Sequence, residues 1–328
     1  MKKSFITNFL ISKHAVLFGM LCCFIFSEIL TSNEIEGKYI PDIQSANSSN
    51  EFIVGYSPSV FRNINLSDAK AASKILLQTI LKHANSNLKS ENVIIHDLIK
   101  NTDIINKKEL NVITMTGIEY LAVRNKVRLY PLAVPAVGDS CLEKLVLLTR
   151  KDSGIKSVSD LKNKTIIVES VVVEDNLNIL NIWLNVLFKR NKIEFKKNRL
   201  TADIKGGSPS RIITNVFFKK YDAAVVLESE LKIVSELNPQ VGKELIVLSE
   251  SKPMLLAISF YTEKQKKAED HELLTSAIFK MHETAAGKNF TKLFRMKKFV
   301  PFMNEYLDNI SELYDEYLAS QKMKNRLR

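Results

Sequence analysis

With 328 residues the chain is too long for one simple hydrophobic core, and two domains are expected. Its 45% apolar and 25% charged residues are ordinary for a globular protein and exclude wholesale disorder. The formal net charge is +11, but the basic residues are scattered, without the aromatic side chains between them that mark a nucleic-acid surface. We therefore predict a basic, solvated surface and no nucleic-acid partner.

The N-terminus, residues 1–32, has the pattern of a signal peptide. Basic residues precede an apolar stretch at 15–26, which is shorter than the roughly 20 residues of a membrane span. An uncleaved membrane anchor extending through Leu30 is the alternative. The polar, Ser- and Asn-rich residues 33–50 predict a flexible tether.

Removal of the signal would leave Cys141 as the single cysteine, so no internal disulfide is expected. Export without disulfides favours a bacterial periplasm over a eukaryotic secretory route, where small domains depend on bridges. The predicted location is the periplasm, with membrane anchoring as the alternative form.

The next part of the chain predicts strands and helices in alternation. Strands are predicted at 51–56, 93–95, 110–115, 129–137 and 144–148, and helices at 67–83 and from about residue 118. A distinctive segment follows at 153–168. It predicts a turn at Gly154, a one-turn helix at 157–161 and a buried strand at 165–168.

The alternation continues to the C-terminus. Helices are predicted at 174–189 and 211–219, and strands at 199–201, 222–227, 244–248 and 253–260. Three C-terminal helices are predicted at 268–284, 287–294 and 304–323. This order predicts an α/β fold, with mainly parallel sheets flanked by helices and with extra C-terminal helices.

Residue patterns that support catalysis are absent from the sequence. The histidines lack metal-ligand spacing, and neither a phosphate-binding Gly-rich loop nor a Gly-x-Ser-x-Gly turn occurs. Cys141 has no evident basic partner that would activate its thiol. We predict a protein that is not an enzyme, with no catalytic residue, no metal and no cofactor.

Four segments carry a resemblance to a known family: 52–58, 114–120, 145–168 and 220–226. In this order and spacing the chain resembles the phosphate/phosphite/phosphonate-binding family of ABC-transporter periplasmic solute-binding proteins. The resemblance implies a type 2 periplasmic-binding fold that closes on a small-molecule ligand in a cleft between two lobes. It assigns residues 51–143 plus 251–328 to lobe I and residues 144–250 to lobe II, each lobe with a mainly parallel sheet. It also implies an ABC permease or a membrane sensor as partner, and a monomer.

The resemblance also implies where a ligand binds. The candidate ligand-binding residues are Tyr56, Ser57, Thr116, Tyr120, Ser170, Ser208, Arg211 and Glu228. The chain departs from the family in lobe II, where Ser170 alone remains of a hydroxyl-rich loop and the histidine that normally follows Ser208 is missing. Acidic residues flank that loop and would repel an oxyanion, whereas the Arg211 guanidinium could bind one in a bidentate manner.

The leading hypothesis is a periplasmic solute-binding protein that captures a phosphonate- or phosphate-like oxyanion, or a related ligand, for an ABC transporter. The alternative is a degenerate binding lobe that acts as a sensory or protein-interaction module without transport. An enzyme on the same fold is the third hypothesis, and it has the least support because the catalytic patterns are missing.

Overall fold

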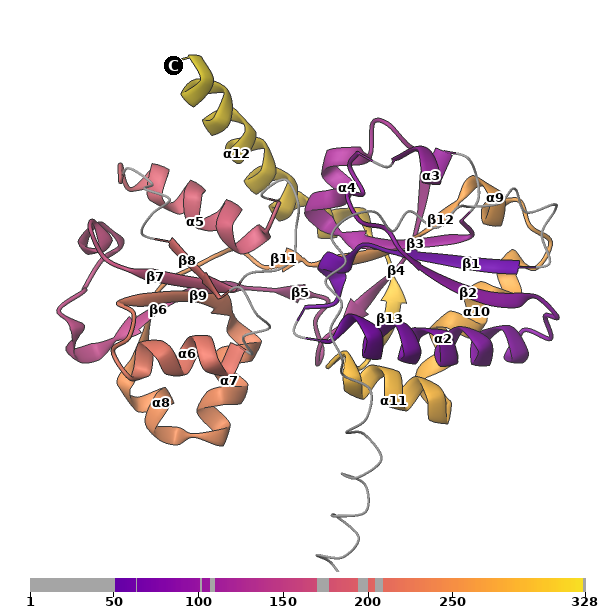
Figure 1. The fold of residues 1–328 in the computed structure, drawn as a ribbon, viewed down its shortest axis with the longest axis horizontal. Helices are drawn as coiled ribbons and strands as arrows, with labels where there is room; N and C mark the ends of the chain where they lie inside the picture. The colour runs from indigo at the N-terminus through magenta and orange to yellow at the C-terminus, as the bar shows by residue number, and fades with distance from the viewer. Residues whose placement is uncertain are drawn as a thin grey trace, which may run out of the picture. The chain divides into compact units, whose positions relative to one another are not determined.

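The computed structural model describes residues 51–326 apart from 63, 101, 107–109, 170–176, 194–199 and 204–208. The predicted signal peptide and tether, and the candidate residues Ser170 and Ser208, lie outside the described residues. The described chain forms two large sheets with helices on both faces of each (Figure 1). None of its helices combines the length and apolar character needed to cross a membrane.

Lobe I is the part built on the six-stranded sheet, with strand order β13-β4-β12-β3-β1-β2. Its strands are β1 (Glu51–Tyr56), β2 (Lys89–Ile94), β3 (Val112–Thr116), β4 (Leu129–Ala136), β12 (Ala257–Thr262) and β13 (Lys298–Pro301). Its helices are α2 (Leu66–His83), α3 (Thr102–Asn106), α4 (Gly117–Val123), α9 (Glu263–Lys266), α10 (His271–Lys280) and α11 (Ala285–Leu293). One face of the sheet carries α2, α10 and α11, and the other carries α3, α4 and α9 (Figure 1).

Helix α2 shows how the sequence produces this packing. It begins after Asn65, whose side chain accepts a hydrogen bond from the Ser67 amide, and Asp68 complements the positive end of the helix dipole. Leu76 and Ile80 lie on its buried face and pack in the core with strand β1.

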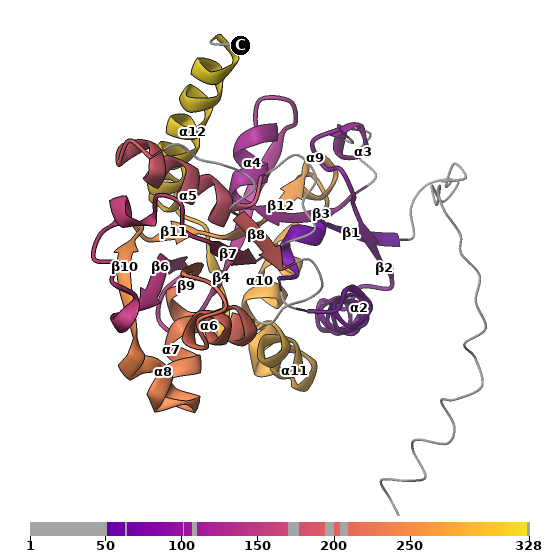
Figure 2. The same ribbon diagram turned by 60° about the vertical axis from the view of Figure 1, so that its left-hand side comes forward.

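Lobe II is the part built on the five-stranded sheet, with order β10-β6-β9-β7-β8. Its strands are β6 (Leu145–Arg150), β7 (Ile166–Glu169), β8 (Leu200–Asp203), β9 (Ala223–Leu227) and β10 (Leu245–Glu250). Its helices are α5 (Ile179–Arg190), α6 (Pro209–Phe217), α7 (Glu228–Leu237) and α8 (Pro239–Glu244). Helix α5 covers one face of the sheet, and α6, α7 and α8 cover the other (Figure 2).

The segment between β6 and β7 has the predicted turn and one-turn helix. Gly154 adopts φ 76°, which is accessible to glycine without steric cost, and a 3-10 helix follows at Val158–Leu161. Ser157 and Asp160 form its capping box, so the short helix begins where the sequence predicts.

The chain passes twice between the sheets, and the two passages pair with each other. Strands β5 (Leu142–Glu143) and β11 (Met254–Leu255) form an antiparallel two-stranded sheet. The last helix, α12 (Asp308–Arg326), packs against α5 of lobe II and α4 of lobe I. Its residues Ile310 and Leu313 belong to the same core cluster as α5.

The two-lobed α/β architecture is confirmed, but the sheets are mixed rather than mainly parallel. Strand β12 is antiparallel to both β3 and β4, and β6 is antiparallel to β9 and β10. A buried strand has the same apolar pattern in either direction, so the sequence could not reveal this. Strands β6 and β12 enter their sheets directly from the other lobe. Because no crossover helix connects them to the preceding strand of the same sheet, they need not be parallel to it.

Candidate ligand-binding cleft

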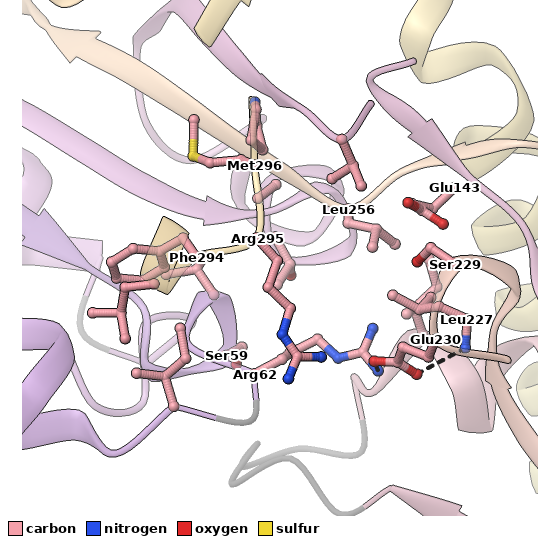
Figure 3. A pocket seen from close by; sticks show the side chains of 18 of the residues that line it. Ser59, Arg62, Glu143, Leu227, Ser229, Glu230, Leu256, Phe294, Arg295 and Met296 are labelled. Carbon is pink, nitrogen blue, oxygen red and sulfur yellow. Dashed lines mark hydrogen bonds and ion pairs between the residues drawn. The ribbon is translucent and has the colours of Figure 1, made fainter. Parts of the chain in front are cut away.

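A cavity of about 450 Å³ is lined by residues from both lobes (Figure 3). Lobe I contributes the segment after β1, the end of β3 and the end of α11. Lobe II contributes the start of α5 and the start of α7. Most of the wall is apolar, and a few charged and hydroxyl side chains converge on it, as is usual for a small-molecule site. We call this cavity the cleft.

Arg62 is the central polar residue of the cleft. A 3-10 turn at Pro58–Val60 after β1 positions it, and its side chain reaches across to lobe II. There it forms an ion pair with Glu169 at the end of β7, in which Nε donates to Oε2 at 3.1 Å. Its Nη2 lies 3.6 Å from Oε1 of Glu230. Its remaining nitrogen, Nη1, is buried and has no hydrogen-bond partner among the described residues.

Carboxylates outnumber guanidinium groups around Arg62. Burial raises the pKa of Glu230, and the charge of Arg62 opposes that rise. Burial also raises the pKa of Glu143, and the hydrogen bonds from Ser229 oppose that rise. Burial would lower the pKa of Arg62, but the charges of Glu169 and Glu230 outweigh it and raise the pKa, so the guanidinium stays charged. The cleft therefore holds a fixed cation beside two carboxyl groups, Glu143 and Glu230, whose pKa values are raised by burial.

Arg295 brings a second guanidinium to the cleft. It follows α11 with a φ of 51°, and its side chain extends toward Arg62, while Glu230 lies beyond Arg62 (Figure 3). Two guanidinium groups that converge on one cavity form a site suited to an anionic ligand with several oxygens.

Behind the cleft, Glu119 occupies a cradle of hydrogen-bond donors in lobe I. Its Oε1 accepts from Ser57 Oγ at 2.5 Å and Ser59 Oγ at 2.9 Å, and its Oε2 accepts from Thr116 N at 2.8 Å and Thr116 Oγ1 at 2.9 Å. Glu119 is only 5% exposed. The hydroxyl groups at the ends of β1 and β3 thus bind an internal carboxylate, which would repel a ligand oxyanion from this corner.

The predicted site residues in lobe I lie in different environments. Thr116 lines the cleft, and Ser57 lies behind it, fully buried against Glu119. Tyr56 packs against Phe61 at a ring distance of 5.2 Å and lines a second cavity of this lobe. Tyr120 packs on Phe260 with ring centroids 4.5 Å apart and is not among the described residues of the cleft wall.

The predicted site residues in lobe II either lie outside the described cleft wall or are not described. Glu228 is the exposed first residue of α7, and Arg211 is exposed on α6; neither is among the described residues of the cleft wall. Ser170 and Ser208 are not described. The role of these residues in ligand binding stays a prediction.

Sequence reasoning missed Arg62, Glu143, Glu230 and Arg295. The rule that ligands bind at the carboxyl ends of strands is the signal that could have found two of them, since Arg62 follows β1 and Glu230 follows β9 by only a few residues. Arg295 gave no signal, because it is brought to the cleft from a distant C-terminal helix.

Residues 100–307, more than half of the chain, match the family described as "ABC transporter, phosphonate, periplasmic substrate-binding protein". Among curated proteins, no sequence is significantly similar to this chain. Solved structures with a similar fold include XAC2383 from Xanthomonas citri bound to ATP, at 14% identity and a TM-score of 0.61, covering 84% of this chain and 99% of that one.

Two further structures with a similar fold have titles that name phosphonates. PhnD1 from Prochlorococcus marinus, in complex with methylphosphonate, is 14% identical with a TM-score of 0.58, covering 80% of this chain and 97% of that one. A binding protein component of an ABC phosphonate transporter from Pseudomonas aeruginosa is 13% identical with a TM-score of 0.56, covering 85% of this chain and all of the other. At these identities the likeness shows a shared fold.

Proposed function

Since the chain belongs to the family of periplasmic substrate-binding proteins of phosphonate ABC transporters, we propose that Arg62 and Arg295 hold the anionic group of its ligand in the cleft. Proteins of this family bind small molecules and interact with ABC permeases. The chemical class of the ligand is then a small oxyanion such as a phosphonate, contacted from lobe I by Arg62 and Arg295 and from lobe II by the start of α7.

The observation that carries this proposal is Nη1 of Arg62, which has no hydrogen-bond partner in the described part of the chain. A buried donor without an acceptor costs about 1–3 kcal/mol, and more when the group is charged. A ligand oxygen at Nη1 would remove that cost, and a second oxygen within reach of Arg295 would make the contact multidentate. The long contact of 3.6 Å to Glu230 is the one that an incoming oxyanion would replace, while the ion pair to Glu169 would persist.

Glu119 explains how the site can differ from the pattern that the family resemblance implies. The hydroxyl cradle in lobe I is filled by this carboxylate, so the oxyanion is shifted toward the guanidinium groups. The ligand would therefore be held by arginine side chains rather than by hydroxyl groups. Its contact with Arg62 would also link it to lobe II, because Arg62 is paired with Glu169.

Titration calorimetry with methylphosphonate, phosphite, phosphate and methylsulfonate tests the proposal. We expect at least one of them to bind, and Arg62→Lys, which keeps the charge but lacks Nη1, to weaken that binding about tenfold. Arg124→Met is the matched control, because Arg124 is exposed at the end of α4, away from the cleft. Unchanged affinity in Arg62→Lys, or no heat with any of the four anions, would refute the proposed site.

We also infer the domain boundaries and the export of the chain. The first passage between the sheets at β5 and the second at β11 support lobe I as residues 51–143 plus 251–328 and lobe II as 144–250, with α12 shared by packing on α5. The periplasmic location of the family supports a cleaved signal at residues 1–32. N-terminal sequencing of the exported protein would test that cleavage, and an intact Met1 would refute it.

A further inference from the structure

Lobe I contains a second cavity of about 160 Å³, with walls that are almost entirely apolar. It lies between the sheet and helices α2, α10 and α11, and its walls include Phe52, Leu76, Leu77, Phe290 and Phe299. We call it the apolar cavity.

The apolar cavity adjoins the cleft. Five residues line both: Val60, Pro135, Ala257, Phe294 and Met296. The two spaces therefore lie next to each other, and Phe294 and Met296 lie on the same side of the cleft in Figure 3. Arg295, one of the proposed anion-binding residues, is the residue between them in sequence.

We propose that the apolar cavity receives the hydrocarbon substituent of the ligand whose anionic group is bound by Arg62 and Arg295. The preferred ligand is then an amphiphilic oxyanion, an alkyl or aryl phosphonate rather than inorganic phosphate. This inference rests on the proposed function, and it adds the chemical nature of the part of the ligand that the guanidinium groups do not contact.

The size of the cavity sets the size of the substituent. An empty apolar cavity of about 150 Å³ accommodates benzene. A cavity of about 160 Å³ thus fits a phenyl group or an alkyl chain of roughly four to six carbons. A longer chain would have to displace the helices that cover this face of the sheet.

Ser73 and Tyr56 bring two polar side chains to the apolar cavity. Ser73 lies on α2, is fully buried and lines the cavity. Tyr56 lines the same cavity; burial raises its pKa to about 12, and its side-chain hydrogen bond with Ser73 opposes that effect. These two groups partner each other, so the rest of the wall is left for a hydrocarbon group.

Calorimetry with methyl-, propyl-, butyl- and phenylphosphonate is the test. Each methylene that enters an apolar site contributes about 0.8 kcal/mol, or roughly fourfold in affinity. We expect butylphosphonate to bind up to roughly 60-fold more tightly than methylphosphonate, and phenylphosphonate to bind comparably.

Two variants fill the cavity from different sides, so the test does not depend on one of them folding. Ser73→Leu on α2 and Val112→Phe on β3 should abolish the gain with chain length and change methylphosphonate affinity less than about threefold, because a methyl group does not reach the cavity. Ala71→Leu is the control, since Ala71 is on the exposed face of α2.

The outcomes separate this inference from the proposed function. Binding of methylphosphonate with no gain along the series would overturn the inference and leave the cleft site intact. A gain that survives in both cavity-filling variants would place the substituent elsewhere and also overturn it. Loss of all anion binding would refute the proposed function. In that case a shift in Tm caused by toluene, lost in Ser73→Leu, would still support an apolar cavity that takes hydrocarbon groups.

Discussion

Replacing Arg62 with methionine tests the electrostatics of the cleft most directly. Arg62 is 16% exposed at its side chain, and its partners Glu169 and Glu230 are 7% and 9% exposed, so the pair is largely removed from water. Removing one member of a buried pair leaves an uncompensated charge and costs about 3–5 kcal/mol. Against a usual stability of about 5–15 kcal/mol, Arg62→Met should remove a large part of the free energy of unfolding at pH 7.

The cost should fall at lower pH. Arg62 lowers the pKa of both Glu143 and Glu230, so its removal raises pKa values that burial has already raised. The folded variant then binds more protons than its unfolded chain, and its stability is lost as the pH rises through the raised pKa. The free energy of unfolding then falls by about 1.4 kcal/mol per pH unit for each extra proton that the folded state binds.

Urea unfolding of Arg62→Met and the unmodified protein at pH 5 and pH 7 measures both effects. We expect the difference in unfolding free energy between the variant and the unmodified protein to be about 1–3 kcal/mol smaller at pH 5 than at pH 7. This corresponds to one extra bound proton over one to two pH units. The triple variant that also carries Glu169→Gln and Glu230→Gln should regain most of the stability. A cost below about 1 kcal/mol at pH 7, or an equal cost at both pH values, would refute this account of the cleft.

Three other predictions concern the same region. Glu119→Gln replaces one accepting oxygen with a donor and should cost about 1–3 kcal/mol in urea unfolding at pH 7, because at least one buried hydrogen bond is lost; a cost below 0.5 kcal/mol would contradict the cradle. Gly117→Ala should lower Tm, since an added Cβ would lie 2.7 Å from the terminal methyl of a core isoleucine and 2.8 Å from a backbone oxygen; a higher Tm would contradict this packing. Methylsulfonate, whose charge is fixed, should bind more tightly at pH 5.5 than at pH 7.5, and its binding should take up protons. The reason is that a bound anion favours the neutral forms of Glu143 and Glu230, whose pKa values burial has raised. The double variant Glu143→Gln and Glu230→Gln should lose this dependence, and a pH-dependent affinity that persists in it would assign the protons to other groups.

Much of lobe II was predictable because its elements carry strong local signals. Strand β9 is a short, fully buried apolar run, and the turn at Gly154 with the capping box of Ser157 marks the segment before β7. Helices α7 and α8 were missed, since α7 begins directly after β9 with acidic residues that look like loop positions. The direction of β6 and β12 was missed because it depends on where the chain enters each sheet.

The amino-acid sequence by itself determined the α/β class, because apolar periodicity, caps and turns act over a few residues and need no distant partner. Four of its segments carried the resemblance to the family and to its two lobes. Through the resemblance it also indicated Thr116, which lines the cleft. Only the tertiary structure decided which side chains meet there. Arg62 pairs with Glu169, 107 residues away, and Glu119 takes the hydroxyl groups that would otherwise remain for a ligand. The ionic character of the cleft and its adjoining apolar cavity follow from contacts between distant segments, and no local pattern encodes them.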